Sequence, residues 1–282
     1  MKQRPEAWRL GRRAELSGGE IAYEVFGDGP PVVLVHGTPS RSYIWRNVVP
    51  ALANHFSVYV FDLLGFGDSE RREGLDISIA AQSRLLAELI EFWQLEDAAI
   101  AGHDIGGGIV LRAHLLEKVP FTRIALIDAV VLHPWITPTT RHVKAHMDAY
   151  LSMPTEVFET IVTSHLRTAT YRPMDEAAFE AYFSQWRGSH GQKLYLQKDA
   201  QLDEEHTAEF EPFLGSIRAS VQIVWGECDA WLNYSFAQRL RETLPDSKLE
   251  LIPDAGHFVM EDEPDTVARV LTNFFARERD AE

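Results

Sequence analysis

The sequence predicts a doubly wound α/β protein, in which helices cover both faces of a mostly parallel sheet. Short continuous runs of Val, Ile and Leu recur along the chain, as expected of strands buried on both faces of such a sheet. Longer segments with helical periodicity separate most of these runs, which is typical of βαβ units. A length of 282 residues suits one α/β core that carries an insertion.

The individual elements follow from these patterns. The predicted strands are residues 21–26, 32–35, 58–61, 98–101, 123–127, 221–225 and 249–252. The predicted helices are residues 43–53, 77–94, 105–118, 235–244 and 265–276.

One long interval breaks the alternation of strands and helices. From about residue 133 to about residue 214 the chain is helical in pattern, rich in aromatic residues and punctuated by prolines. A structureless loop of that length is improbable in a compact domain. We therefore predict a helical cap over residues 133–214, inserted into a core formed by residues 1–132 and 215–282.

Charge and composition restrict the partners of the protein. The formal net charge of -15 argues against nucleic acids and anionic membranes, because phosphate binding needs clustered Lys and Arg. The chain has no run approaching the roughly 18 apolar residues of a membrane span, and no apolar signal-peptide core follows its basic opening. The single cysteine, Cys228, fits a reducing compartment. We expect a cytoplasmic protein.

The most informative motif is Gly-His-Asp-Ile-Gly, which places Asp104 between the predicted strand 98–101 and the predicted helix 105–118. Gly-x-nucleophile-x-Gly at a strand-to-helix turn is the nucleophile elbow, which exposes one side chain at the carboxyl edge of a sheet. The alternative is an aspartate that merely caps a helix. The neighbouring motifs favour the elbow.

An aspartate nucleophile predicts a particular class of substrate. Its attack on an acyl carbon would leave a high-energy anhydride, whereas its attack on a saturated carbon leaves an ester that water can hydrolyse. Asp104 therefore indicates an electrophilic sp3 carbon, as in epoxides and carbon–halogen compounds.

Three further segments supply the partners that such a nucleophile needs. Gly37 follows strand 32–35, so that the backbone N–H groups of Thr38 and Ile105 are candidates for an oxyanion hole. His257 lies on a glycine loop after the last strand and is the candidate general base. The acid that orients it is Asp229, after strand 221–225, or Asp128, after strand 123–127. The order nucleophile, acid, histidine favours Asp229.

On these motifs the chain resembles the α/β-hydrolase superfamily, specifically its aspartate-nucleophile branch of haloalkane dehalogenases and epoxide hydrolases. The resemblance covers roughly residues 20 to 278. It rests on HGTPSRSYIWRNVVP, DLLGFGDS, GHDIGG, GECD and AGHFVMEDEP, which begin at residues 36, 62, 102, 226 and 255. It implies an eight-stranded sheet and a two-step hydrolysis, without cofactor or metal, of a small apolar or amphipathic molecule.

Departures from the family pattern bear on the leaving group. Many dehalogenases carry Trp after the nucleophile and Asn after the HG pair to solvate the halide, but here these positions are Ile105 and Thr38. A halide without donors in an apolar pocket would carry a large desolvation cost. Epoxide hydrolases instead use cap tyrosines. The candidates for substrate or leaving-group binding in the cap are Tyr195, which best matches the family's cap tyrosine, Tyr150, Trp135 and His146.

Three functional hypotheses follow from the sequence. The first is an epoxide hydrolase, favoured by Ile105. The second is a haloalkane or haloacid dehalogenase whose halide site comes from Trp and His donors in the cap. The third is a ligand-binding or sensor protein that keeps the hydrolase pocket without useful turnover.

Overall fold

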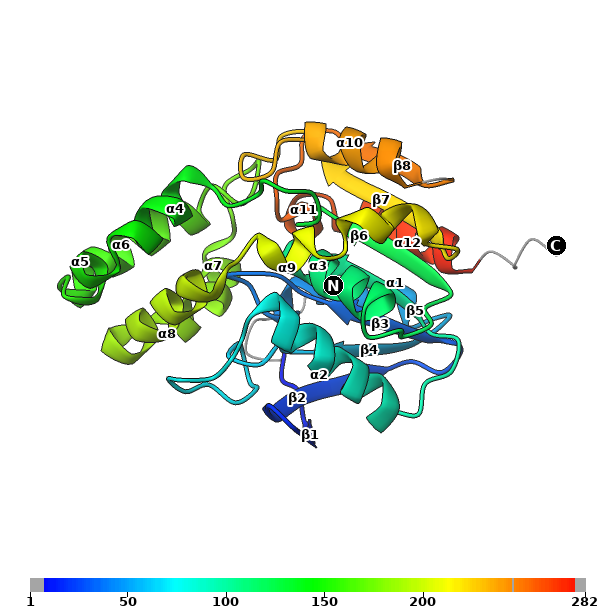
Figure 1. The fold of residues 1–282 in the computed structure, drawn as a ribbon, viewed down its shortest axis with the longest axis horizontal. Helices are drawn as coiled ribbons and strands as arrows, with labels where there is room; N and C mark the ends of the chain where they lie inside the picture. Colours follow the sequence, from blue (N-terminus) through cyan, green and yellow to red (C-terminus); the bar gives the residue numbers. More distant parts are fainter. Residues whose placement is uncertain (1–7, 245, 277–282) are drawn as a thin grey trace.

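The computed structural model describes residues 8–244 and 246–276, which form an eight-stranded sheet with helices on both faces (Figure 1). The strand order is β1-β2-β4-β3-β5-β6-β7-β8, with β2 antiparallel to its two neighbours β1 and β4 and the remaining pairs parallel. The strands are β1 (Arg12–Leu16), β2 (Gly19–Phe26), β3 (Pro31–Val35), β4 (Ser57–Phe61), β5 (Ala99–His103), β6 (Arg123–Ile127), β7 (Ser220–Gly226) and β8 (Lys248–Ile252).

Helices of the core pack on the two faces of this sheet. Helix α2 (Ile79–Phe92) contacts α3 (Ile105–Leu115), and α1 (Val49–Leu52) contacts α12 (Pro264–Phe275). Helix α10 (Ser235–Thr243) contacts β7 and β8, and the short α11 (Val259–Asp262) precedes α12. The predicted doubly wound α/β class is confirmed, and each of the seven predicted strands corresponds to a strand of the sheet.

The eighth strand, β1, was implied by the family resemblance but not located in the sequence. Its residues Arg-Arg-Ala-Glu-Leu expose both arginines and Glu15, and Ala14 is the one fully buried member. An edge strand of this kind lacks the continuous apolar run that marks a strand buried on both faces. Charged side chains on an edge also discourage pairing with another chain.

The single helix predicted over residues 43–53 is wrong, because the chain forms two short turns there. The 3-10 turn η2 spans Ser42–Trp45, and α1 begins only at Val49. Pro50 lies in the first turn of α1. A proline has no N–H to donate to the carbonyl four residues earlier, so a continuous helix through this position would lose a bond.

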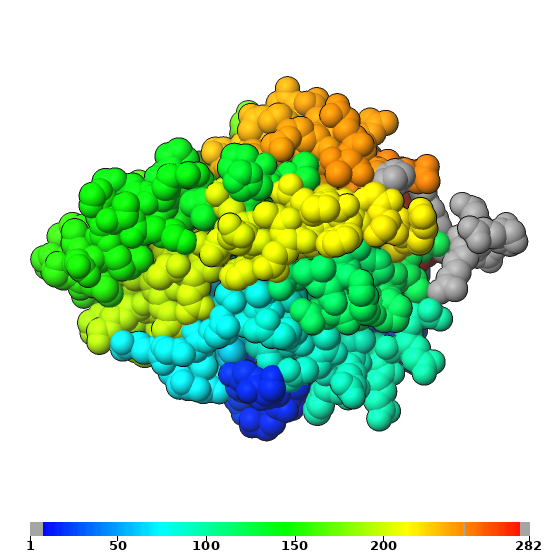
Figure 2. Space-filling view, viewed as in Figure 1, coloured from blue at the N-terminus to red at the C-terminus, as the bar shows by residue number. Residues whose placement is uncertain are grey.

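Between β6 and β7 every regular element that the structure describes is helical. These are α4 (Pro138–Ala145), α5 (Met147–Leu151), α6 (Thr155–Leu166), α7 (Glu176–Phe183), η3 (Ser184–Trp186), α8 (Gly188–Gln201), α9 (Glu205–Ala208) and η4 (Glu211–Ser216). Helices α4 to α8 form a lobe that projects to the left in Figure 2.

The strand order creates a crevice at one edge of the sheet. The chain passes from β3 to β4 on one side of β3 and then returns to β5 on the other side. The connections that leave β3 and β5 therefore diverge, and in open α/β sheets ligands bind outside the carboxyl ends of strands at such a point. Residues 36–38 and Asp104 occupy these two strand ends. Among the described residues, no helix has the length and apolar character needed to cross a bilayer.

Candidate active site

Asp104 lies on a sharp turn between β5 and α3, with a backbone φ of 53° that L-residues seldom adopt. Small residues on either side make this turn possible. A Cβ on Gly102 would lie 2.5 Å from the carbonyl oxygen of Gly106, and a Cβ on Gly106 would lie 2.6 Å from that of His36. Only glycine fits at both positions. The Asp104 side chain, 8% exposed, is therefore held at the crevice in one orientation.

A backbone amide holds one oxygen of the Asp104 carboxylate. The N–H of Thr38 donates to Oδ1 over 2.7 Å, and the N–H of Ile105 is among the groups that lower the pKa of this carboxyl. The close approach of the Thr38 backbone to Asp104 requires glycine at position 37, because a Cβ there would lie 2.3 Å from Cβ of Asp104. The structure thus brings together the two predicted oxyanion amides and the predicted nucleophile.

His257 bridges Asp104 and Asp229. Its Nε2 lies 3.4 Å from Oδ2 of Asp104, and its Nδ1 lies 2.8 Å from Oδ2 of Asp229. The other oxygen of Asp229 accepts hydrogen bonds from the backbone N–H groups of Trp231 and Leu232, at 2.8 and 2.9 Å. Asp229 therefore has a fixed orientation and presents its free oxygen to the imidazole.

Asp128, the second candidate acid, lies behind this pair. Its Oδ1 accepts a hydrogen bond from the backbone N–H of Gly226 over 2.9 Å, and one of its carboxylate oxygens lies within 4.8 Å of one of Asp229. Burial, and next the negative charge of Asp229, raise the pKa of Asp128 well above its usual range. A protonated Asp128 can donate to Asp229. The hydrogen bonds thus favour Asp229 as the acid that orients His257.

The charges on Asp104 and His257 depend on each other. Burial favours a neutral Asp104, but the hydrogen bond and charge of His257 prevail and lower its pKa. Burial likewise disfavours a charged His257, but Asp229 first and then Asp104 prevail and raise its pKa well above the usual range. The resting site therefore holds an ionised Asp104 beside a protonated His257.

His103 supports the backbone of His257 rather than the chemistry. It is fully buried, and its Nε2 lies 2.9 Å from the backbone oxygen of His257. Burial, and next the positive charge on His257, lower the pKa of His103 to about 3. It is neutral at ordinary pH, so it donates a hydrogen bond to that carbonyl without adding charge.

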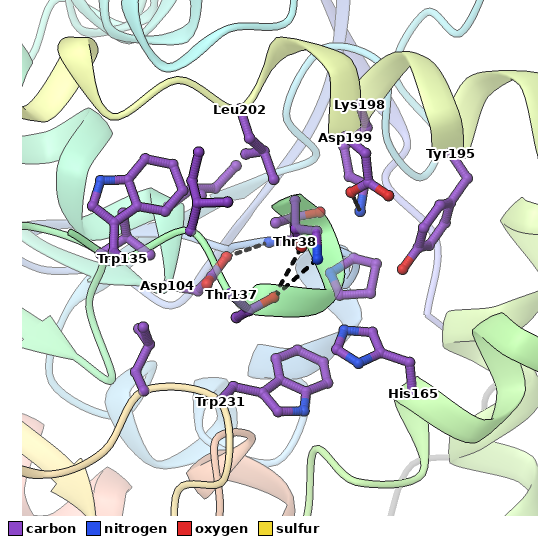
Figure 3. Close-up of a pocket in the computed structure, with 16 residues that line it drawn as sticks. Thr38, Asp104, Trp135, Thr137, His165, Tyr195, Lys198, Asp199, Leu202 and Trp231 are labelled. Atoms are coloured by element: carbon purple, nitrogen blue, oxygen red, sulfur yellow. Dashed lines mark hydrogen bonds and ion pairs between the residues drawn. The ribbon is translucent and has the colours of Figure 1, made fainter. Parts of the chain in front are cut away.

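A cavity with about 530 Å³ of empty space, part of it open to solvent, lies over Asp104 (Figure 3). Most of its walls are apolar, whereas one corner is polar and is formed by α8. The lining residues are Thr38, Pro39, Asp104, Ile105, Val130, Trp135, Ile136, Thr137, Thr140, His165, Tyr195, Lys198, Asp199, Leu202, Trp231 and Leu232. The cavity therefore suits a small molecule with an apolar body and a polar end.

The four cap residues expected to contact a substrate are placed differently. Tyr195 and Trp135 line the cavity. Tyr150 and His146 are not among the lining residues: His146 is exposed on the lobe and its ring contacts His142. For these two residues the sequence offered aromatic character alone, which does not distinguish a cavity wall from a lobe surface.

Among the cavity residues that sequence reasoning missed are two charged and two aromatic side chains. Lys198 and Asp199 follow Tyr195 by three and four positions, so they share its face of α8, and this spacing was a signal that could have revealed them. His165 and Trp231 stack on each other with ring centroids 4.2 Å apart. No sequence pattern links these two, because they come from α6 and from the loop after β7.

Comparisons with known proteins agree with this architecture. A model of the alpha/beta hydrolase family matches residues 32–270. Haloalkane dehalogenase 2 of Mycobacterium tuberculosis is 27% identical over 273 residues, which cover 93% of each chain. A crystal structure of an alpha/beta hydrolase fold protein from Burkholderia ambifaria has a TM-score of 0.92 and 31% identity, covering 97% of this chain and 100% of that one. A ligand-free epoxide hydrolase, at 22% identity, has a TM-score of 0.75 and covers 94% and 98%.

Proposed function

This chain belongs to the alpha/beta hydrolase family, and we propose that it hydrolyses a bond at a saturated carbon through an ester on Asp104. The observation that carries the proposal is the position of the Asp104 carboxylate. Its Oδ1 is held by the N–H of Thr38, while its Oδ2 faces His257 at the floor of the cavity. A carboxylate fixed by one oxygen has the other free to attack.

In the first step Oδ2 of Asp104 attacks the electrophilic carbon and the leaving group departs with the bonding electrons. The lowered pKa of Asp104 keeps the nucleophile ionised while His257 carries its proton. The product is an alkyl ester whose carbonyl oxygen remains in the oxyanion hole formed by Thr38 and Ile105.

Ester formation prepares His257 for the second step. It neutralises Asp104, which is one of the two carboxylates that raise the pKa of His257. The pKa of His257 therefore falls, the imidazolium releases its proton to solvent, and the neutral ring can then take a proton from water. The resulting hydroxide attacks the ester carbonyl carbon while the backbone amides stabilise the oxyanion. On collapse the leaving oxygen takes a proton from the imidazolium and departs as the alcohol, and the regenerated Asp104 carboxylic acid returns a proton to His257.

An epoxide is the lead candidate for the substrate. The O–H of Tyr195 is available, because burial raises the pKa of Tyr195 to about 12 and keeps it protonated. The indole N–H groups that could solvate a halide already have protein acceptors. Trp135 donates to Thr207 and Trp231 donates to Thr168, each over 2.9 Å.

A dehalogenase is the second candidate. The similarity to haloalkane dehalogenase 2 of Mycobacterium tuberculosis supports it. In this reading the halide would need donors other than the two occupied indoles. Under either reading residues 133–214 act as the cap that closes the cavity, residues 1–132 and 215–282 carry the catalytic side chains, and Asp229 orients His257.

Single turnover in heavy-oxygen water tests the mechanism. Protein in excess is mixed with one epoxide and, separately, with the bromoalkane of the same carbon skeleton. Hydrolysis of an ester on Asp104 places the first heavy oxygen on the Asp104 side chain, which peptide mass spectrometry detects, and leaves the first product unlabelled. Label in the first product with none on Asp104 would mean direct attack by water and would refute the proposal.

A further inference from the structure

The polar corner of the cavity contains a buried ion pair that the mechanism above does not use. Nζ of Lys198 lies 2.6 Å from Oδ1 of Asp199, and each side chain is only 6% exposed. Both residues line the same cavity as Asp104. Burying two charges costs free energy that their attraction does not reliably recover. A buried pair at a cavity wall therefore calls for a functional reason.

The ammonium group of Lys198 has hydrogen-bond donors that the ion pair with Asp199 does not use. It carries three N–H bonds. One points to Asp199, and a second interacts with Tyr195, whose ring centroid lies 3.7 Å from Nζ. Burial disfavours the charge, but Asp199 outweighs it and raises the pKa of Lys198. The group therefore stays protonated beside the bound substrate.

Asp199 has acceptor capacity as well. Its Oδ1 pairs with Lys198, and Figure 3 shows the pair beside Tyr195 on the wall of the cavity formed by α8. The corner thus offers a proton donor and a proton acceptor within one ion pair. A hydroxyl group at this corner can both accept and donate a hydrogen bond.

We propose that Lys198, held by Asp199, is the acid that protonates an oxygen leaving group, so that the site opens epoxides in preference to displacing halides. The inference rests on the proposed attack by Asp104. As Asp104 bonds to one epoxide carbon, the carbon–oxygen bond breaks and its electron pair takes a proton from Lys198. The products are a hydroxyalkyl ester and a neutral lysine.

The hydroxyl group that forms when the epoxide opens matches the hydrogen-bonding groups of the polar corner. It accepts from Lys198 or Tyr195 and donates to Asp199. A halide ion only accepts hydrogen bonds, and the Asp199 carboxylate repels it. The proton that His257 releases before ester hydrolysis replaces the one that Lys198 gave up, directly or through water, and the regenerated Asp104 carboxylic acid then reprotonates His257. Each turnover then converts one epoxide and one water into one diol.

The test measures how fast the ester forms, using His257→Gln as the background because it blocks ester hydrolysis. Intact-mass spectrometry follows adducts from a terminal epoxide and from the bromoalkane of the same skeleton. Into this background we introduce Lys198→Gln with Asp199→Asn, which removes both charges while keeping polar groups of similar size, and Asp199→Asn alone. Thermal unfolding confirms that each variant folds.

The double change should slow the epoxide adduct by about 100-fold or more, the usual contribution of general acid catalysis, and should slow the bromide adduct far less. Asp199→Asn alone should shift the ratio of the two rates toward bromide, because an isolated ammonium suits a halide.

A purely structural role would slow both compounds equally and would overturn the inference. Epoxide alkylation that is unchanged by the double substitution, or an adduct from the bromide alone, would also overturn it. No adduct from either compound in the His257→Gln protein would instead refute the proposed function itself.

Discussion

Nε2 of His257 lies 3.4 Å from Oδ2 of Asp104, the oxygen that the oxyanion amide of Thr38 does not hold. The two oxygens of one carboxylate therefore have separate environments. Oδ1 is bound by the backbone, and Oδ2 faces the imidazole and the cavity. This division suits a side chain that first attacks through one oxygen and is then itself attacked at its carbonyl carbon.

Replacement of His257 by Gln should separate the two steps. Asp104 keeps its backbone contacts, so the ester still forms, but no base activates water. Intact mass should show one stable adduct per chain, mapped by peptide analysis to Asp104. His190→Gln, at an exposed histidine, is the matched control and should show normal turnover. Continued turnover by the His257→Gln protein would contradict the assignment of the base.

Asp229 and Asp128 should respond differently to the same chemical change. Asp229→Asn removes the charge that supports the imidazolium and should slow ester hydrolysis by at least about 100-fold. Asp128→Asn should slow ester hydrolysis by less than about 10-fold, because the amide of Asn can still donate to Asp229 and accept from the N–H of Gly226. Pre-steady-state measurement of ester decay compares the two. The reverse order would make Asp128 the orienting acid.

Much of this site was predictable because its residues follow strand ends. Asp104, Asp229 and His257 follow within five residues of the ends of β5, β7 and β8, and parallel strands place such positions at one edge of the sheet. Lys198 could not be located in the same way. A helical lobe has no strand ends to set the position of its residues, so the sequence does not show which helix faces the cavity.

The same reasoning explains the errors in the fold. Burial patterns revealed the central strands, whereas β1 is a charged edge strand with only Ala14 fully buried. Periodicity predicted one helix over residues 43–53, although Pro50 lies within it. The resemblance favoured Tyr195 but kept Tyr150 as a candidate, and only the three-dimensional packing shows that Tyr195 lines the cavity and Tyr150 does not.

The two steps should depend on pH in different ways. The lowered pKa of Asp104 keeps the nucleophile ionised down to below about pH 4. Ester hydrolysis needs neutral His257, so it slows as the pH falls through the pKa of His257 in the ester. The ester should therefore accumulate at roughly pH 5 and become scarcer as the pH rises through that pKa, which Asp229 still raises. Quenched-flow mass analysis across this pH range checks this. Equal ester fractions would mean that His257 does not limit hydrolysis.

Chelators should not affect turnover. Asp128, Asp229 and His257 each offer one ligand atom, all within 4.8 Å of one another, a spacing that could suit a metal ion. In the proposed mechanism their hydrogen bonds to one another and to the backbone supply the needed orientation. Extended dialysis against a chelator, with metal analysis of the protein before and after, should leave activity unchanged. Activity that is lost on dialysis and restored by a divalent cation would assign these side chains to a metal instead.

Gly102→Ala should damage the elbow more than the rest of the fold. The added Cβ would lie 2.5 Å from the carbonyl oxygen of Gly106, so the turn that carries Asp104 must shift. Such overpacking costs about 1–3 kcal/mol of unfolding free energy. Gly215→Ala is the matched control, because no atom lies within 4 Å of its added Cβ.

Urea unfolding measures the stability of both variants, and the rate of ester formation reports on Asp104. We expect the Gly102 variant to lose stability and to form the ester more slowly, because a shifted turn moves Oδ1 away from the N–H of Thr38. A Gly102→Ala protein as stable and as reactive as its control would show that the elbow does not need glycine there.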